Sequence, residues 1–246
     1  MSEPTLVAAR TLLARSHRTA VFSGAGLSAE SGIPTFRGHT DDALWSRFDP
    51  QELASVEGFA ANPERVIAWY NWRRGKLAHA QPNAAHMALA AQPQLVQITQ
   101  NVDDLLERAG VAAARILHLH GTLGRDRCHA GCGYQEPVDL AHPPPLRPCP
   151  RCGAPLRPAV VWFGEMLPQR VWSEAQRICA SVNCLLVVGT SSAVYPAAGL
   201  IEVAAAAGAT VISVNTEPAG AFGPKHIELI GPASEVVPAL LEGCAA

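Results

Sequence analysis

Four cysteines gather in a proline-rich segment of this 246-residue chain. Three residues separate Cys128 from Cys132, two separate Cys149 from Cys152, and sixteen lie between the pairs. This spacing is close to that of ribbons in which four thiolates bind one zinc ion tetrahedrally. Because four thiolates fill the coordination sphere, we expect a structural ion and not a catalytic one. Unligated core cysteines are the alternative, and His129 leaves the identity of one ligand open.

A glycine-rich turn over residues 24–29 follows the short apolar run 19–22, which predicts a strand, a turn and a helix in this order. The turn matches the dinucleotide fingerprint, in which missing side chains let backbone amides and a helix N-terminus approach a pyrophosphate. A dehydrogenase would also need an acidic residue at a strand end about 20 positions on. The loop 31–38, with proline, glycine and arginine, stands there instead. A purely structural tight turn is the alternative.

Polar side chains follow the next apolar runs directly. Gln100, Asn101 and Asp103 come after the run 95–99, at the edge where open α/β sheets bind ligands, although Asn101 or Asp103 could instead cap a helix. His118 and His120 alternate along the following strand and therefore face opposite sides. His120 ends that strand and is the better candidate for a general base, with a hydrogen-bonded structural histidine as the alternative.

An aromatic and cationic pair lies in the helical stretch around residue 70. Tyr70 and Arg73 are three residues apart, and Tyr70 and Arg74 are four apart, so each pair shares a helix face. A phenol and a guanidinium on one face can bind a carboxylate. The alternative is a solvated arginine beside a core tyrosine.

Strands alternating with helices predict an α/β protein with a Rossmann-like, doubly wound parallel sheet and a smaller lobe made of a zinc ribbon and helices. The buried strands are expected at 19–22, 95–99, 116–119, 160–163, 185–188 and 211–215. The helices are expected near the N-terminus and at 103–109, 169–180 and 197–207. Gly110 is expected to end the helix at 103–109, and Gly208 the helix at 197–207. Residues 31–90 read as an inserted helical module without strands.

Composition narrows the class of partner. With 48% hydrophobic residues, 16% charged residues and a net charge of −2, nothing favours nucleic acid or an anionic membrane. No basic segment followed by an apolar stretch opens the chain, so we expect a cytoplasmic protein. Cys179, Cys184 and Cys244 are expected to be free thiols in a reducing compartment.

Taken together, these motifs resemble the sirtuins over nearly the whole chain. The matching segments are 24–37, 99–103, His120-Gly121, the cysteine pairs, 160–165 and 189–191. The segment from Tyr70 to Arg73 further resembles class III members, which remove negatively charged acyl groups from lysine. The resemblance implies NAD-dependent protein-lysine deacylation that removes succinyl and malonyl groups, and acetyl as a second activity, with release of nicotinamide and O-acyl-ADP-ribose.

The resemblance also implies roles for individual residues. Catalysis would fall to His120 as the base, with Asn101 and Asp103. Cofactor binding would fall to Gly24, Ala25, Gly26, Ser28, Ala29, Thr35, Phe36, Arg37, Gln100, Asn101, Asp103, Gly189, Thr190, Ser191, Asn215, Glu217 and Ala233. Substrate binding would fall to Ala54, Tyr70, Arg73, Val161, Trp162, Phe163, Gly164 and Glu165, and zinc binding to Cys128, Cys132, Cys149 and Cys152.

A single catalytic domain is expected, with a large lobe at about 1–37, 91–121 and 158–246, and a small lobe at about 38–90 and 122–157. The partners would be acylated-lysine proteins or peptides and NAD, with a monomeric chain. Ala159 replaces the histidine usual in related sequences, and the loop 38–44 is about two residues longer than expected. Two other functions stay open: a mono-ADP-ribosyltransferase on the same fold, and a non-catalytic NAD-binding zinc module.

Overall fold

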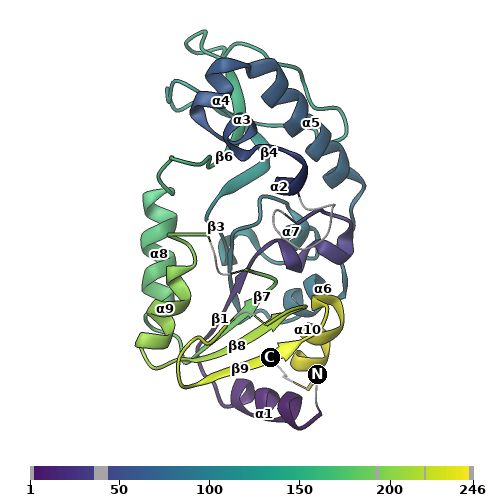
Figure 1. The fold of residues 1–246 in the computed structure, drawn as a ribbon, viewed down its shortest axis with the longest axis vertical. Helices are drawn as coiled ribbons and strands as arrows, with labels where there is room; N and C mark the ends of the chain where they lie inside the picture. Colours follow the sequence, from purple (N-terminus) through teal and green to yellow (C-terminus); the bar gives the residue numbers. More distant parts are fainter. Residues whose placement is uncertain (1–2, 36–43, 192–193, 219, 244–246) are drawn as a thin grey trace.

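A six-stranded parallel sheet lies in the lower half of the molecule as drawn in Figure 1. The computed structural model describes residues 3–35, 44–191, 194–218 and 220–243. The strands lie in the order β3-β2-β1-β7-β8-β9, so chain progression reverses between β1 and β7. Their bounds are β1 Thr19–Ser23, β2 Val96–Thr99, β3 Ile116–His118, β7 Cys184–Val188, β8 Thr210–Asn215 and β9 His226–Ile230. The predicted doubly wound sheet is confirmed, with a sixth parallel strand at its edge in β9.

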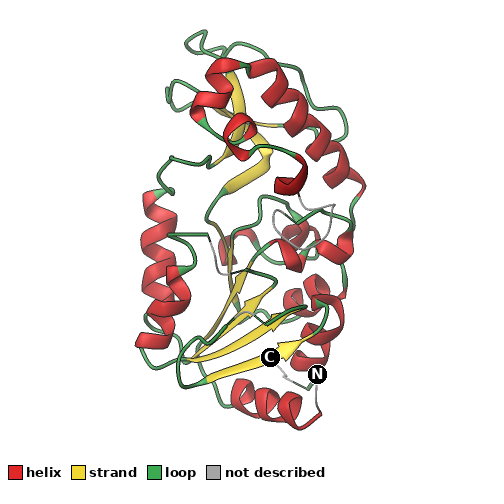
Figure 2. Ribbon diagram, viewed as in Figure 1, coloured by secondary structure: helices red, strands yellow, loops and turns green. Residues whose placement is uncertain are grey.

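Helices cover both faces of this sheet (Figure 2). One face packs on α8 Gln169–Cys179 and α9 Gly199–Ala206, through a core that includes Phe22, Ala175 and Leu200. The other face packs on four helices: α1 Glu3–Ala14, α6 Ala84–Ala90, α7 Leu105–Arg108 and α10 Ala233–Leu241. Apolar strand residues alternate between these two cores, as a sheet buried on both faces requires.

A third core lies beyond the carboxyl ends of the strands. It joins four helices to a three-stranded antiparallel sheet, in the order β5-β4-β6. These elements are α2 Leu44–Arg47, α3 Pro50–Leu53, α4 Val56–Ala61, α5 Pro63–His79, β4 Gly121–Cys128, β5 Gln135–Pro137 and β6 Leu156–Val160. We call them, with their loops, the small lobe. Asn62 starts α5 by accepting a hydrogen bond from the Arg65 amide, with Pro63 at the first helical position.

The predicted helical module at 31–90 divides between the small lobe and the main sheet. Helices α2 to α5 belong to the small lobe, whereas Ala85 and Leu89 of α6 pack beneath the main sheet with Leu6 and Val237. Burial of this apolar face against α1 and α10 therefore draws α6 away from the helices that precede it.

Two expectations about local structure are wrong. The run 160–163 is no strand of the parallel sheet: β6 ends at Val160 and pairs antiparallel with β4. The helix expected after the glycine turn is also absent from the described residues here; two short 3-10 turns stand in its place, η1 Ala25–Leu27 within the turn and η2 Ala29–Ser31 at its end. Gly32 then takes a left-handed conformation (φ 81°) and Pro34 follows, so a helix cannot continue.

Other elements end close to where the sequence predicts. Gly110 (φ 107°) follows α7, and Gly208 (φ 88°) follows α9, each in the left-handed region that terminates a helix. A short 3-10 turn, η3 Ala113–Arg115, leads into β3. Among the described residues, no helix is both long and apolar enough to span a membrane.

Candidate active site and metal centre

A cavity of about 920 Å³ opens over the carboxyl ends of the sheet, between the sheet and the small lobe. Its walls come from the loops after β1, β2, β7 and β8, together with α5 and the segment after β6. Open α/β sheets bind ligands where the strand order reverses, and here the reversal lies between β1 and β7. A volume near the upper end of the ~300–1,000 Å³ range of ligand sites suits a large ligand.

The glycines of the predicted dinucleotide turn allow two loops to meet. The Gly26 amide donates to the Gly189 carbonyl oxygen at 2.8 Å, and the Gly24 amide donates to that of Val188 at 2.9 Å. A Cβ on Gly26 would lie 2.6 Å from the Gly189 Cα atom, which no side chain tolerates. The turn therefore shapes the cavity floor by close backbone packing, and the Gly26 amide itself is already used.

Polar side chains link the ends of neighbouring strands across this floor. The Gln100 Nε2 group donates to Thr190 Oγ1 at 3.0 Å, and the Asn215 Nδ2 group donates to the Thr190 carbonyl oxygen at 3.1 Å. Ser191 and Glu217 also line the cavity. The loops after β2, β7 and β8 are thus fixed relative to one another before any ligand binds.

His120 faces the cavity and His118 does not, as their alternation predicts. The Nδ1 atom of His120 lies 3.1 Å from the Gln100 carbonyl oxygen. Since a carbonyl oxygen only accepts, Nδ1 carries the proton and Nε2 of the neutral ring keeps its lone pair. Burial lowers the pKa of His120, with the Gln100 contact opposing it, which favours the neutral form that a base needs.

His118 stabilises the loop that carries Asn101. Its Nε2 atom lies 2.8 Å from Glu107 Oε1, and its Nδ1 atom lies 3.1 Å from the Asn101 carbonyl oxygen. Both neighbours are acceptors, so the imidazolium satisfies both contacts. Although burial acts against the charge, the hydrogen bond and charge of Glu107 prevail and raise the pKa of His118.

A buried polar network supports Asn101 from below. Ser28 is fully buried; its hydroxyl donates to Asp103 Oδ2 at 2.9 Å and accepts from Asn101 Nδ2 at 3.2 Å. His86, which the sequence reading missed, places Nε2 3.4 Å from the same hydroxyl. Burial lowers the pKa of His86 to about 4, and burial raises the pKa of Asp103. The Asn83-x-x-His86 spacing predicts only a helix cap, which the structure has, and not the contact with Ser28.

The predicted acyl-binding residues lie together at the small-lobe end of the cavity. Ala54, Tyr70 and Arg73 all line it, and the exposed fractions of Tyr70 and Arg73 are 1% and 8%. The guanidinium carbon of Arg73 lies 5.0 Å from the ring centre of Trp69 and 5.5 Å from that of Tyr70. Burial lowers the pKa of Arg73, but an arginine stays charged near neutral pH.

Arg74 has a different place from Arg73. Its side chain is fully buried and pairs with Asp126 of β4 at 2.6 Å, while its Nε group donates to the Leu123 carbonyl oxygen at 3.0 Å. Arg147 reaches the second carboxylate oxygen of Asp126 at 2.9 Å. Arg74 therefore joins α5 to the ribbon and takes no part in the cavity wall.

The segment 161–165 forms one side of the cavity. The Val161 amide donates to the His120 carbonyl oxygen at 2.9 Å, and the Phe163 amide donates to the Ala54 carbonyl oxygen at 2.8 Å. The Trp162 amide donates to Glu165 Oε2 at 2.9 Å. These three amides hold the segment in place along the cavity, as does the Glu165 amide, which donates to the Trp162 carbonyl oxygen at 3.0 Å.

The remaining predicted residues fall in three groups. Gly164, Thr35 and Ala233 line the cavity, as do Ala25 and Ala29, whereas Ser28 and Asp103 lie beneath its floor. Phe36, Arg37 and most of the loop 38–44 lie outside the described residues. Lining residues outside the predicted set are Glu30, Ile33, Pro34, Val102, Val160, Leu167, Val194, Tyr195, Pro196, Val214, Thr216, Pro218 and Gly231. Each lies within five positions of a predicted residue, and no residue type marked them.

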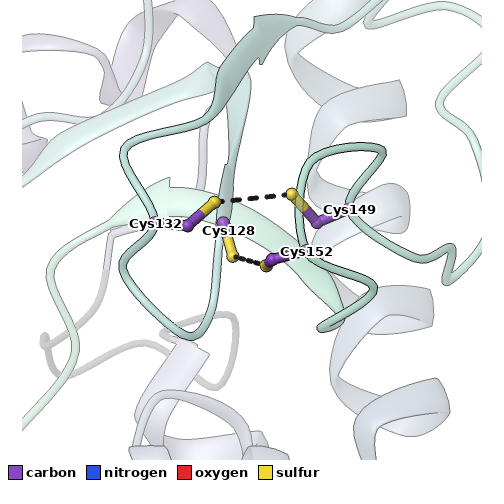
Figure 3. Close-up of side chains that lie close together, drawn as sticks. All are labelled: Cys128, Cys132, Cys149 and Cys152. Atoms are coloured by element: carbon purple, nitrogen blue, oxygen red, sulfur yellow. Dashed lines mark hydrogen bonds between the residues drawn. The ribbon is translucent and has the colours of Figure 1, made fainter.

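The four predicted zinc ligands converge between two loops of the small lobe (Figure 3). Cys128 and Cys152 have their sulfurs 3.4 Å apart, Cys132 and Cys149 have theirs 3.7 Å apart, and all four sulfurs lie within 4.8 Å of one another. Tetrahedral coordination with zinc–sulfur bonds of about 2.3 Å needs sulfurs about 3.8 Å apart, so the donor set fits zinc. His129 packs on the ring of Phe59 at 4.9 Å and stands outside this cluster.

Comparison with known proteins gives a consistent family. A model described as the Sir2 family matches residues 24–196. The chain is 48% identical over 233 residues to an NAD-dependent protein deacylase of Mycobacterium tuberculosis, covering 92% of this chain and 97% of that protein. It superposes on a Sir2 homologue in an ADP-ribose complex with a TM-score of 0.89, at 42% identity, covering 99% and 96% of the two chains. For a Sir2 homologue in an NAD complex the TM-score is 0.87, with 42% identity and coverage of 99% and 94%.

Proposed function

The chain belongs to the Sir2 family, and from this premise we propose an NAD-dependent protein-lysine deacylase that prefers succinyl- and malonyl-lysine. Two observations support NAD-dependent deacylation: the similarity to the NAD-dependent protein deacylase of Mycobacterium tuberculosis, and the cavity where the strand order reverses. The acyl preference depends on one observation: Arg73 and the Tyr70 hydroxyl lie buried at the far end of that cavity, beside the small side chain of Ala54.

A buried arginine at a cavity wall selects for a negative charge in the ligand. The distal carboxylate of a succinyl or malonyl group could accept from both the guanidinium and the phenol, with the bidentate geometry that arginine favours. An acetyl group has no such carboxylate and would leave these donors facing an apolar methyl. Because only a carboxylate can make the charge-assisted contact with Arg73, the site should discriminate by charge as well as by contact area.

NAD would lie across the strand ends in this proposal. Thr190, Ser191 and Asn215 would hold its phosphates and adenine ribose, while Gln100 and Asn101 would shape the pocket of the nicotinamide and its ribose. When bound, NAD supplies the ribose carbon that receives the acyl oxygen, and nicotinamide as leaving group. The hydrogen bonds already made among these side chains preorganise the site, so that little reorganisation is needed during reaction.

His120 would act as the base through its Nε2 atom. The Gln100 carbonyl oxygen fixes the proton on Nδ1, so Nε2 points its lone pair at the cavity and can take a proton from a ribose hydroxyl. The network of Ser28 and Asp103 would hold Asn101 at the same end of the cavity. The substrate backbone would pair with the segment 161–165 by strand addition, and so peptides of many sequences could bind.

The test is kcat/KM for one peptide that carries either succinyl-lysine or acetyl-lysine, with NAD. We expect the wild type to prefer the succinyl peptide and Arg73→Met to lose that preference, since a charge-assisted contact to a buried group is worth roughly 2–5 kcal/mol. Arg65→Met is the matched control, because Arg65 lies on the same helix with 58% of its side chain exposed. Turnover of the acetyl peptide alone by the wild type would overturn the acyl preference and keep the deacylase.

A further inference from the structure

Trp162 lines the cavity beside Tyr70 and contacts this residue directly. Its exposed fraction is 2%, and its Nε1 group donates to the Tyr70 hydroxyl oxygen at 2.8 Å. The ring centres of Trp162 and Phe59 are 5.2 Å apart, and those of Trp162 and Tyr70 are 6.3 Å apart. The indole therefore reaches the phenol from within an aromatic cluster, away from solvent.

This hydrogen bond has a fixed direction. An indole N–H can only donate, so the Tyr70 oxygen must accept, and the phenol's own proton is left to donate to another group. Tyr70 lines the cavity, where an acyl group would sit. With one lone pair engaged by the indole, the rotation of the Tyr70 O–H bond is restricted to the directions that remain.

The indole is itself held on three sides. The guanidinium carbon of Arg157 lies 3.8 Å from the ring centre of Trp162, and Arg157 is ion-paired with Glu165. The carboxylate of Glu165 also accepts from the Trp162 amide at 2.9 Å and from Arg127 at 2.9 Å. A cation on the ring face, a carboxylate at the backbone and a phenol at the ring nitrogen together allow the indole a single orientation.

We infer that Trp162 is a positioning residue that determines acyl selectivity, because its indole N–H turns the Tyr70 hydroxyl proton toward the distal carboxylate of the acyl group. The inference rests on the proposed function and deepens it: Arg73 supplies the charge, whereas Trp162 supplies the direction of the second donor. The Arg157–Glu165 pair supports this arrangement, because it holds the Trp162 ring, which in turn orients the Tyr70 hydroxyl.

The test is the ratio of kcat/KM on succinyl peptide to kcat/KM on acetyl peptide in four proteins: wild type, Trp162→Phe, Tyr70→Phe and the double variant. Losing one aligned neutral hydrogen bond should lower this ratio roughly three- to tenfold in Trp162→Phe, mainly through KM for the succinyl peptide. In the Tyr70→Phe background, Trp162→Phe should lower the ratio no further, because its effect passes through the hydroxyl. Trp72→Phe is the control: Trp72 lies on α5 with 40% exposure.

The outcomes separate this inference from the proposed function. A wild type without succinyl preference overturns the proposed function. Suppose instead that the wild type has that preference. If Trp162→Phe then keeps the wild-type ratio, or lowers kcat/KM on both peptides equally, only the role of Trp162 is overturned. If Trp162→Phe does not fold, benzothienylalanine at position 162 gives the same readout, because it keeps the size of the indole and lacks its N–H. An additive loss in the double variant would also contradict the inference.

Discussion

His120 places Nδ1 3.1 Å from the carbonyl oxygen of Gln100, and this contact fixes which ring nitrogen faces the cavity. The two residues come from consecutive strand ends, β2 and β3, so the contact depends on the parallel pairing of those strands. Because the same loop carries Asn101 and lines the cavity, the contact holds the proposed base in a fixed place relative to the polar groups of the site.

Replacing His120 should separate catalysis from binding. We expect His120→Ala to lower deacylation roughly 10²–10⁴-fold, the usual contribution of a general base, while NAD affinity stays largely intact. Turnover follows from nicotinamide release, and NAD affinity from titration calorimetry. Full activity in the variant would remove the proposed base. Mass spectrometry of the products also distinguishes O-acyl-ADP-ribose from the ADP-ribosylated protein that a transferase would give.

The His118–Glu107 pair should make stability depend on pH. The pKa of His118 is raised above 6.5, so its contribution is complete below that value and is lost as pH rises through the folded-state pKa. The pKa of Glu107 is lowered below 4.5, because its contact with His118 outweighs burial, so its contribution is present above 4.5 and is lost as pH falls. The pair should therefore stabilise most between these two values.

His118→Gln measures this dependence. Urea unfolding should show a larger loss of stability near pH 6 than near pH 9, by less than about 1 kcal/mol because both side chains are partly solvated. Glu107→Gln should give the same trend. A loss that is equal at both pH values would mean that the charged pair contributes nothing.

The backbone contact at Gly189 predicts a large effect from a single methyl group. In Gly189→Ala the Cβ atom would lie 2.3 Å from the Leu27 nitrogen, at a φ of 61°. We expect the strained conformation and the clash to lower the free energy of unfolding by roughly 2–5 kcal/mol in total. NAD should also bind more weakly. Gly208→Ala is the matched control, since Gly208 has a φ of 88° and no atom within 4 Å of an added Cβ.

Chemical denaturation gives both values. The control should lose only the conformational part, about 1–2 kcal/mol, and keep its NAD affinity. Equal losses in the two variants would show that the turn and the β7 loop need no close approach.

The cysteine cluster predicts one zinc ion that stabilises the small lobe. Cys149→Ser should lose the metal and unfold this lobe, because the segment around it, residues 143–150, is rich in proline and has a core of only a few side chains. Atomic absorption and thermal melting check this. Cys179→Ala, at a buried cysteine outside the cluster, should keep its zinc. A stable, active Cys149→Ser protein without zinc would contradict the structural site.

Short, continuous apolar runs predicted the main sheet, because such runs are typical of strands that are buried on both faces. The edge strand β9 escaped notice, since its sequence mixes His226 and Glu228 with apolar residues, and Pro238 obscured α10. The run 160–163 misled for the opposite reason: it is apolar because Trp162 fills the small lobe.

Side-chain roles depended on contacts that no local pattern encodes. Spacing put Arg73 and Arg74 near Tyr70, yet only the position of Asp126, far along the chain, decides which one turns into the ribbon. His86 reaches Ser28 across 58 residues of sequence, and so its part in the buried network could not be read from spacing.

Arg73 and Arg74 are adjacent in sequence, yet α5 sends one into the cavity and the other into the ribbon. Evolution can therefore act on the two positions separately. Under the proposed function, a change at 73 would alter which acyl groups are accepted while leaving the interior intact, whereas a change at 74 would leave the buried Asp126 carboxylate without one of its partners and destabilise the small lobe. Acyl preference could therefore diverge among descendants of this protein while the fold stays unchanged.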